Sequence, residues 1–283
     1  MLKIAIQKSG RLFEDSIKLL KECGIELNNG NKQLKTIAGN FPMEIYFLRD
    51  DDIPQYVYDG VADIGFVGEN VFLEKGKDID MIYRLGFGKC RLSIAVPKSI
   101  TYNSVSDLDG LKIATSYSNL LQKFLTEKNI NAEIHEISGS VEIAPGIGLA
   151  DAICDLVSSG STLFTNGLKE VEVVLKSEAV LIANKNIAEE DKKILEKLLL
   201  RINAVKTAQN NKYILLNAPN SQLKNIIAVL PGMKSPTIVP LAEEGWSSVQ
   251  SVVKEDIFWE VIEKLKSLGA EGILVVPIEK MIL

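Results

Sequence analysis

Short apolar runs alternate with amphipathic segments over the first part of the chain. Runs of strand length occupy residues 3–7, 43–48 and 61–68. Between the first two, residues 13–23 carry the periodicity of a helix, and Gly24 follows as its expected end. An alternation of strands and helices predicts an α/β fold, in which ligands bind at the carboxyl ends of the strands.

The same organisation recurs in the middle of the chain. Residues 60–63 and 148–151 both read Gly-x-Ala-Asp, and each leads into an apolar strand. We therefore predict two similar lobes that each contribute one strand end to a shared cleft. The strand-rich stretch 81–97 is expected to cross from the first lobe to the second, and strands at 166–175 and 179–183 are expected to return.

The C-terminal residues follow a different order. A helix at 189–209 is expected to close the first lobe, and the pattern then reads strand, helix, strand, strand, helix, strand, the ferredoxin-like arrangement. These six elements are expected at residues 213–217, 221–230, 237–241, 247–253, 257–268 and 273–278. The predicted parts are a discontinuous first lobe (1–90 and 170–209), a second lobe (91–169) and a separate C-terminal domain (210–283).

Composition and charge narrow the class of protein. The chain has 283 residues, of which 46% are hydrophobic and 24% charged, with a net charge of −5. An acidic exterior disfavours nucleic acids and membrane surfaces as partners. The N-terminal apolar run is too short for a signal peptide, and no stretch approaches the length of a membrane span. We therefore expect a cytoplasmic protein that binds neither nucleic acid nor membrane.

Histidine and cysteine usage excludes several chemistries. His135 is the only histidine, which argues against a histidine-rich metal site and against a nucleophile activated by histidine. The cysteines, Cys23, Cys90 and Cys154, show neither CxxC spacing nor a disulfide framework. They are expected to be reduced and to pack as small hydrophobic residues.

The strongest chemical signal lies at the end of the strand predicted at 151–157. After Asp151 at its first position, Asp155 is the only charged residue inside this strand, and a small hydroxyl-rich loop follows it. The loop consists of Ser158, Ser159, Gly160, Ser161 and Thr162. Its N–H groups and hydroxyls can converge on a phosphate, while a carboxylate before it can accept from a sugar diol. The pattern suits a ribose 5-phosphate; the alternative is a strand that simply ends in a polar turn.

The surrounding residues carry a longer signature. It consists of Glu142, Gly148, Ala150, Ile153, Asp155-Leu156, Ser159-Gly160 and Thr162-Leu163. This gapless spacing resembles that of the ATP phosphoribosyltransferases, which open histidine biosynthesis. The resemblance implies a two-lobed core like that of periplasmic binding proteins and assigns the phosphoribosyl pyrophosphate site to Asp155 and the loop. Glu142 and Asp155 are candidate catalytic residues.

Two segments of the first lobe also resemble the family. Residues 7–12 are similar to its opening motif, so Lys8, Ser9, Gly10 and Arg11 are implied to contact the nucleotide. By themselves, two exposed cations near the start of a helix are usually just solvated. In Arg49-Asp50-Asp51-Asp52-Ile53-Pro54, an aspartate can cap the following helix, and Arg49 either forms a structural ion pair or lines the site. The resemblance favours the site.

Three further residues are candidate nucleotide contacts. Glu69 follows a glycine turn, where it is either a helix N-terminal carboxylate or a group facing the cleft. Arg91 opens a strand and is a candidate anion contact. Tyr117 lies in an Ala-Thr-Ser-Tyr segment that resembles the family and can stack on a base, with helix capping by Ser118 as the structural alternative.

The C-terminal domain also resembles a known part of the family. The long form of the enzyme carries an ACT-like domain that binds histidine as feedback inhibitor, and Pro231-Gly232 and residues 236–241 look like its motif. The resemblance implies an effector site near Asn217 and Thr237. Asn217 carries no charge, which could weaken recognition of the inhibitor's amino group.

The family implies transfer of phosphoribosyl from phosphoribosyl pyrophosphate to N1 of ATP, with Mg²⁺ bridging the pyrophosphate oxygens. The chemistry requires positioning and charge stabilisation rather than an enzyme nucleophile. Glu142 could orient the loop or bind through magnesium. Homodimers assembling into homohexamers are implied as well. The alternatives are a solute-binding protein and a catalytically idle regulatory protein.

Overall fold

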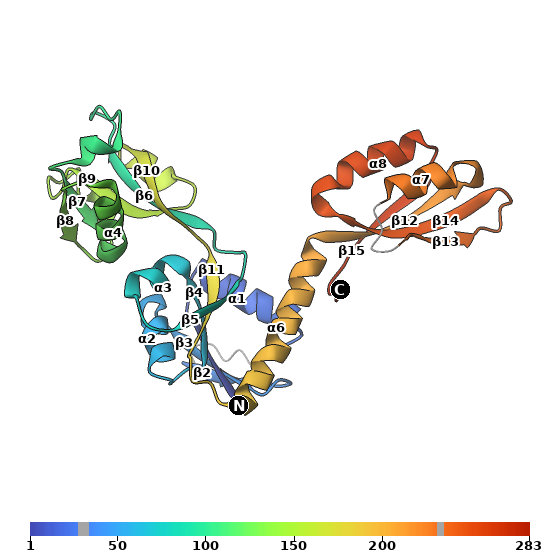
Figure 1. The fold of residues 1–283 in the computed structure, drawn as a ribbon, viewed down its shortest axis with the longest axis horizontal. Helices are drawn as coiled ribbons and strands as arrows, with labels where there is room; N and C mark the ends of the chain where they lie inside the picture. Colours follow the sequence, from blue (N-terminus) through green and yellow to red (C-terminus); the bar gives the residue numbers. More distant parts are fainter. Residues whose placement is uncertain (28–33, 231–234) are drawn as a thin grey trace. The chain divides into compact units, whose positions relative to one another are not determined.

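A computed structural model describes residues 1–27, 34–230 and 235–283 (Figure 1). Its contacts divide the chain into two units, which we describe separately. The first comprises residues 1–20 and 25–194, and the second comprises residues 21–24 and 195–283. The predicted motif Pro231-Gly232 lies outside the described residues.

The first unit contains a six-stranded sheet with the order β2-β3-β1-β4-β11-β5. Its strands are β1 (Leu2–Gln7), β2 (Lys35–Ile37), β3 (Met43–Leu48), β4 (Ile64–Gly68), β5 (Asp80–Arg84) and β11 (Ala179–Ala183). Its helices are α1 (Arg11–Glu22), α2 (Ile53–Tyr58) and α3 (Glu69–Lys75). β1 pairs in parallel with β3 and β4, so the loops after these three strands share one edge.

The interior of this sheet explains the apolar runs in the sequence. Three of the six β1 side chains are fully buried in succession, because the central strand is covered on both faces. Gly65 in β4 allows close packing: a Cβ there would lie 2.6 Å from Cγ2 of Ile53 at the start of α2. β2, which the hydrophobic pattern did not predict, is a short strand at the edge of the sheet.

A five-stranded sheet with the order β10-β6-β9-β7-β8 forms the second lobe. Its strands are β6 (Cys90–Pro97), β7 (Lys112–Thr115), β8 (Glu133–Glu136), β9 (Ala152–Val157) and β10 (Leu168–Ser177), and its helices are α4 (Ser118–Lys128) and α5 (Ser161–Thr165). The apolar stripe of α4, including Leu121 and Leu125, packs against this sheet. His135 lies on β8.

Two extended connections join the lobes. The chain leaves the first sheet at β5 and enters the second at β6, and it returns from β10 to β11. The two-lobed fold predicted from the sequence is therefore confirmed. The return lies later than the boundary expected at residue 170, because β10 stays paired with β6 as far as Ser177 opposite Cys90.

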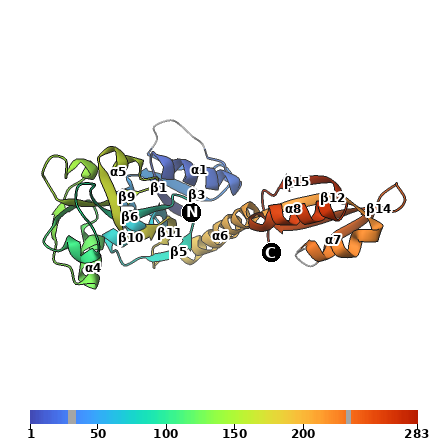
Figure 2. The same ribbon diagram turned by 90° about the horizontal axis from the view of Figure 1, so that it is seen from above.

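The C-terminal elements form a four-stranded antiparallel sheet with the order β13-β14-β12-β15. They are β12 (Asn211–Pro219), α7 (Leu223–Val229), β13 (Thr237–Pro240), β14 (Trp246–Lys254), α8 (Phe258–Ser267) and β15 (Glu271–Pro277). The contacting helices α7 and α8 lie side by side (Figure 2). The ferredoxin-like prediction is confirmed.

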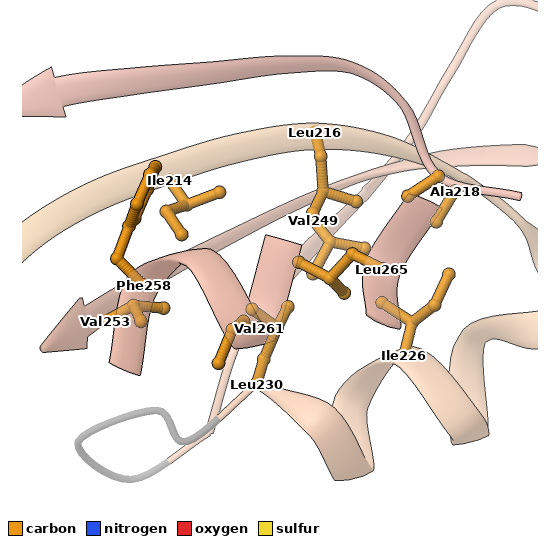
Figure 3. Packing of buried hydrophobic residues seen from close by; sticks show 11 residues of the cluster. Ile214, Leu216, Ala218, Ile226, Leu230, Val249, Val253, Phe258, Val261 and Leu265 are labelled. Carbon is orange, nitrogen blue, oxygen red and sulfur yellow. The ribbon is translucent and has the colours of Figure 1, made fainter. Parts of the chain in front are cut away.

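A single apolar cluster holds this arrangement together (Figure 3). Ile214 and Leu216 from β12, Val249 from β14 and Leu265 from α8 are all fully buried in it. The division between the units falls inside the helix α6 (Glu189–Gln209), whose later turns cluster with the C-terminal elements.

Candidate functional site

The loop after β9 has the geometry that its composition indicates. β9 ends at Val157, and Gly160 adopts a left-handed conformation with φ of 81° at the N-terminal cap of α5. Only glycine enters this region without steric cost. The Oγ atoms of Ser159 and Ser161 lie 3.0 Å apart. The turn thereby gathers hydroxyls beside the first N–H groups of α5, which have no partners within the helix.

A cavity of about 240 Å³ opens at this loop. Its polar lining comes from Glu142, Asp155, Ser158, Ser159, Gly160 and Thr162. The structure therefore brings together all the predicted phosphoribosyl pyrophosphate residues except Ser161, which is not in the lining. Leu156, Val157 and Leu163 supply an apolar part of the wall that the sequence analysis did not assign.

Asp155 lies partly buried at the end of β9. Burial raises the pKa of its carboxyl, the Leu156 N–H donating at 2.7 Å to Oδ1 lowers it, and the charge of Glu142 raises it again. Both carboxylates belong to residues that line the same cavity. Such a pair can accept from sugar hydroxyls or provide oxygen ligands for a divalent cation.

Two arginines reach the first residue of the loop. Nη1 of Arg11, at the start of α1, donates to Oγ of Ser158 at 3.4 Å, and Nη1 of Arg91, in β6, donates to its carbonyl at 3.3 Å. Arg91 is held by two 2.5 Å bonds to Glu170, which also raise the pKa of the guanidinium. Cations from both lobes thus meet at the phosphate loop.

The parallel strand ends of the first lobe carry the other predicted nucleotide contacts. Lys8, Ser9 and Gly10 follow β1, and the Lys8 N–H donates to the carbonyl of Leu48 in the neighbouring β3 at 2.8 Å. Arg49 follows directly after β3. The structure therefore brings the two basic segments, far apart in the sequence, to one edge of the sheet.

The acidic run after Arg49 forms a 3₁₀ turn, Asp50–Asp52. Asp52 takes the cap position of α2, but its side chain makes no capping hydrogen bond. The alternative of a structural ion pair for Arg49 is not seen among the described residues, and the carboxylate of Asp51 lies 3.8 Å from Lys75 instead. Burial raises the pKa of Asp50 to about 6.

Glu69 is the first residue of α3 and is almost fully buried. Its carboxylate accepts from both terminal nitrogens of Arg84, at 2.8 and 2.5 Å. Arg84 also lies 3.3 Å from Glu178 on the returning connection. Glu69 is therefore a helix N-terminal carboxylate that holds a cation at the crossing between the lobes. It is not among the lining residues of the cavity after β9, and its contact with the nucleotide stays a prediction.

Tyr117, rather than Ser118, is the N-terminal cap residue of α4. The Ser118 hydroxyl instead donates to Glu136. Burial raises the pKa of the Tyr117 phenol, whose oxygen accepts from Nδ2 of Asn70 in α3 at 3.1 Å. Nearby, the Glu74 carboxylate of α3 accepts from the first backbone N–H groups of α4, those of Asn119 and Leu120, each at 2.9 Å.

These supporting residues were missed by sequence reasoning. Glu170 pairs with Arg91 across 79 positions, and Glu74 pairs with α4 across 45. No local spacing signals such contacts, because the first forms when β10 pairs with β6 within the second lobe and the second forms when α3 of the first lobe meets α4 of the second. The carboxylates look like ordinary solvated charges in the sequence.

The predicted effector residues lie in the second unit. Asn217 on β12 pairs with Ser248 of β14, and Thr237 on β13 pairs with Gln250 two positions along the same strand. Side chains two positions apart in a strand share a face. Asn217 and Thr237 are therefore on one face of the sheet, opposite the face on which Leu216 joins the helical core.

Within the described ranges, no group of three or more histidine, cysteine, aspartate or glutamate side chains could hold a metal ion. The part of the chain that the structure describes also has no helix long and apolar enough to cross a bilayer. Among the residues that line the cavity after β9, Asp155 and Glu142 carry the carboxylates that could act as metal ligands.

The fold and the site together define a class: a two-lobed α/β protein with a cavity lined by hydroxyls and carboxylates in its second lobe and a ferredoxin-like C-terminal domain. Comparison with known proteins narrows this class. The family model "ATP phosphoribosyltransferase" matches residues 49–204, and "HisG, C-terminal domain" matches residues 208–280. The chain belongs to the ATP phosphoribosyltransferase family, pentosyltransferases of histidine biosynthesis.

The similarity covers the entire chain. ATP phosphoribosyltransferases of Cytophaga hutchinsonii and Bacteroides thetaiotaomicron are each 62% identical over 282 residues, covering 100% of this chain and 99% and 100% of their own lengths. Among solved structures, the ATP phosphoribosyl transferase (HisG:HisZ) complex from Thermotoga maritima aligns with a TM-score of 0.60 at 31% identity. That alignment covers 72% of this chain and 99% of the other.

Proposed function

We propose that the protein transfers the phosphoribosyl group of phosphoribosyl pyrophosphate to N1 of the adenine of ATP and releases pyrophosphate. The observation that carries this proposal is the cavity after β9, where Asp155 and the hydroxyl-rich loop line one space beside Arg11 and Arg91. A carboxylate that can accept from ribose hydroxyls, next to hydroxyls and arginines that can bind anionic groups, suits a phosphorylated ribose.

In this proposal, Asp155 accepts hydrogen bonds from the ribose hydroxyls. Ser158, Ser159, Gly160 and Thr162 bind the 5-phosphate through hydroxyls and N–H groups. As the bond from C1 to the pyrophosphate lengthens, the ribose gains oxocarbenium character, which the nearby carboxylates stabilise. Ser161 would support Ser159 through their contact and would not touch the phosphate.

The nucleotide would bind at the strand ends of the first lobe. Lys8, Arg11 and Arg49 carry the charges that suit its phosphates, with Ser9 and Gly10 in the same loop, and Tyr117 offers a ring for the base. N1 of adenine already has a lone pair, so the reaction requires neither a nucleophilic side chain nor a strong base. Alignment of the two substrates provides the rate enhancement.

Magnesium fits the donors in the cavity after β9. Mg²⁺ is typically bound through one or two carboxylates together with substrate phosphates, and Asp155 and Glu142 offer two carboxylates in the lining of one cavity. When bound, the ion would neutralise charge on the departing pyrophosphate. Glu142 would thus act as a ligand or orient the loop.

The C-terminal domain would bind histidine as feedback inhibitor on the face that carries Asn217 and Thr237. An amide and a hydroxyl on a sheet face can bond an amino acid's polar groups, although the neutral Asn217 would attract an ammonium less strongly than a carboxylate would. We propose a cytoplasmic enzyme built from homodimers that associate into homohexamers.

The test is absorbance of the N1-alkylated adenine product from purified protein with ATP, phosphoribosyl pyrophosphate and Mg²⁺, and with a pyrophosphatase to prevent reversal. We expect product formation, suppressed by histidine. Asp155→Asn should reduce turnover by about 100-fold or more through lost transition-state stabilisation. Asp151→Asn, at the opposite end of β9, is the control and should retain turnover.

Each alternative gives a different result. Uninhibited product formation would retain the enzyme and reject the histidine site. A folded wild-type protein that forms no product, but binds histidine, would favour the regulatory role. Wild-type turnover by Asp155→Asn would reject the assignment of the ribose site.

A further inference from the structure

A second and larger cavity, of about 370 Å³, lies where the two connections cross between the lobes. Arg84, at the end of β5, and Lys89 and Arg91, around the start of β6, line its outgoing side. Lys176 and Glu178 contribute from the returning connection, and Ser158 from the phosphate loop. Four cations and one carboxylate therefore face this space.

The two arginines already have carboxylate partners. Arg84 is bonded to Glu69 and Glu178, and Arg91 to Glu170. Lys89 and Lys176 are exposed, and neither forms an ion pair with a residue that the structure describes. The cavity thus presents two ammonium groups that form no ion pair within the described ranges.

The sheet register makes this excess positive charge costly. Arg91 and Lys176 are directly opposite each other in the antiparallel pairing of β6 with β10. Like charges in this position destabilise a sheet. Glu170 compensates Arg91, but no described residue compensates Lys176. A bound anion would relieve the repulsion, so the arrangement favours an anionic ligand.

The position of Ser158 identifies the kind of anion. Ser158 lines both the cavity after β9 and the second cavity, and its carbonyl accepts from Arg91. A ligand in the second cavity would therefore adjoin a ribose phosphate in the first. Lysines on two different strands suit a chain of several phosphates better than a single one, because lysine binds each phosphate as a separate point charge.

We propose that this cavity binds a polyphosphate chain and that Lys89 and Lys176 are its principal contacts. The proposal deepens the proposed function and rests on it. Two substrates could provide the chain: the pyrophosphate of phosphoribosyl pyrophosphate, which departs in the reaction, or the triphosphate of ATP. Both are polyphosphate chains that lysine ammonium groups can bind, and the KM values for the two substrates can distinguish them.

The test uses the full-length protein and inorganic tripolyphosphate or pyrophosphate as calorimetric probes. We expect Lys89→Gln with Lys176→Gln to raise the Kd of at least one probe about 10-fold or more, since each lysine contributes a charge-assisted contact. Lys123→Gln, an exposed lysine of α4, is the matched control and should leave the Kd unchanged. Lys176→Arg, which keeps the charge, should retain most of the affinity that Lys176→Gln loses.

Initial rates then separate the two sources. A raised KM for phosphoribosyl pyrophosphate alone assigns the cavity to the leaving group, and a raised KM for ATP alone assigns it to the triphosphate. An unchanged Kd for both probes in the double variant overturns the proposal, whatever the rates. Because the probes bind without turnover, a wild-type protein that binds them but forms no product would fail the proposed reaction and leave the anion site standing.

Discussion

Two aspartates illustrate how burial decides the properties of single residues. Asp155 and Asp50 both have a raised pKa, with burial as the main cause. Asp155 faces a cavity and accepts an N–H bond, whereas Oδ1 of Asp50 is buried without a hydrogen-bond partner in the described structure. The carboxylate of Asp155 is therefore available to a ligand, whereas the buried carboxylate of Asp50 is expected to lower the stability of the folded protein.

Asp50→Asn should stabilise the protein at neutral pH. The pKa of Asp50 is about 6 in the folded protein against an ordinary 3.8, so the proton favours folding. That contribution is complete below about pH 4 and is lost as the pH rises through 6. We expect the free energy of unfolding at pH 7.5 to rise by about 1 to 2 kcal/mol.

Urea denaturation of both proteins between pH 4 and 8 measures this effect. The gain should shrink toward pH 4, where the native aspartate is already protonated. Asp51→Asn, whose side chain is largely exposed, should change stability by less than about 0.5 kcal/mol at every pH. A gain of equal size at pH 4 and pH 8 would show that shape, and not charge, explains the Asp50 effect.

At the scale of elements, the sequence predicts strands well and long-range contacts poorly. The pattern predicts β3 at its observed bounds, and composition draws attention to the loop from Ser158 to Thr162, although only the family resemblance favours a phosphate site there over a plain polar turn. The partners of Arg91 and Tyr117 could not be predicted. Their positions depend on how β10 and α3 pack against distant elements, and periodicity reports only which face of an element is apolar.

The contact of α3 with α4 gives a prediction at this scale. Glu74 satisfies two N–H groups at the N-terminus of α4 and places a negative charge near its positive dipole. Glu74→Ala should therefore lower the free energy of unfolding by about 1 to 3 kcal/mol. It should also raise the KM for ATP more than that for phosphoribosyl pyrophosphate. Tyr117 is the N-terminal cap residue of the same helix, so loosening this helix end would displace the ring proposed to contact the adenine base.

The matched control is Glu127→Ala on the last turn of α4. Its carboxylate is mostly exposed and lies 4.0 Å from Lys123, so its loss should change stability by less than about 0.5 kcal/mol. Denaturation curves and initial rates of the wild type, Glu74→Ala and Glu127→Ala measure the effects on stability and on the two KM values. Equal increases in both KM values for Glu74→Ala would mean that the contact supports the fold in general and not the nucleotide side.

At the scale of the whole molecule, the chain consists of two units with separate apolar cores. Ile113 is fully buried in the second lobe, and Leu216 is fully buried in the C-terminal domain. The sequence places the domain boundary at residue 210, just after the end of α6, whereas the contacts divide the chain within this helix, because a sequence signals where a helix ends and not where its contacts change. α6 belongs in part to each unit.

Separate cores should give separate unfolding transitions in calorimetry. Leu216→Ala removes packing from one core, so it should lower the stability of one transition by about 2 to 5 kcal/mol, and Ile113→Ala should do the same to the other. Leu200→Ala, at an exposed position of α6, should shift neither by more than about 0.5 kcal/mol. A single transition that both core variants shift equally would instead mean that α6 couples the two units into one cooperative structure, because each core variant would then destabilise the whole chain.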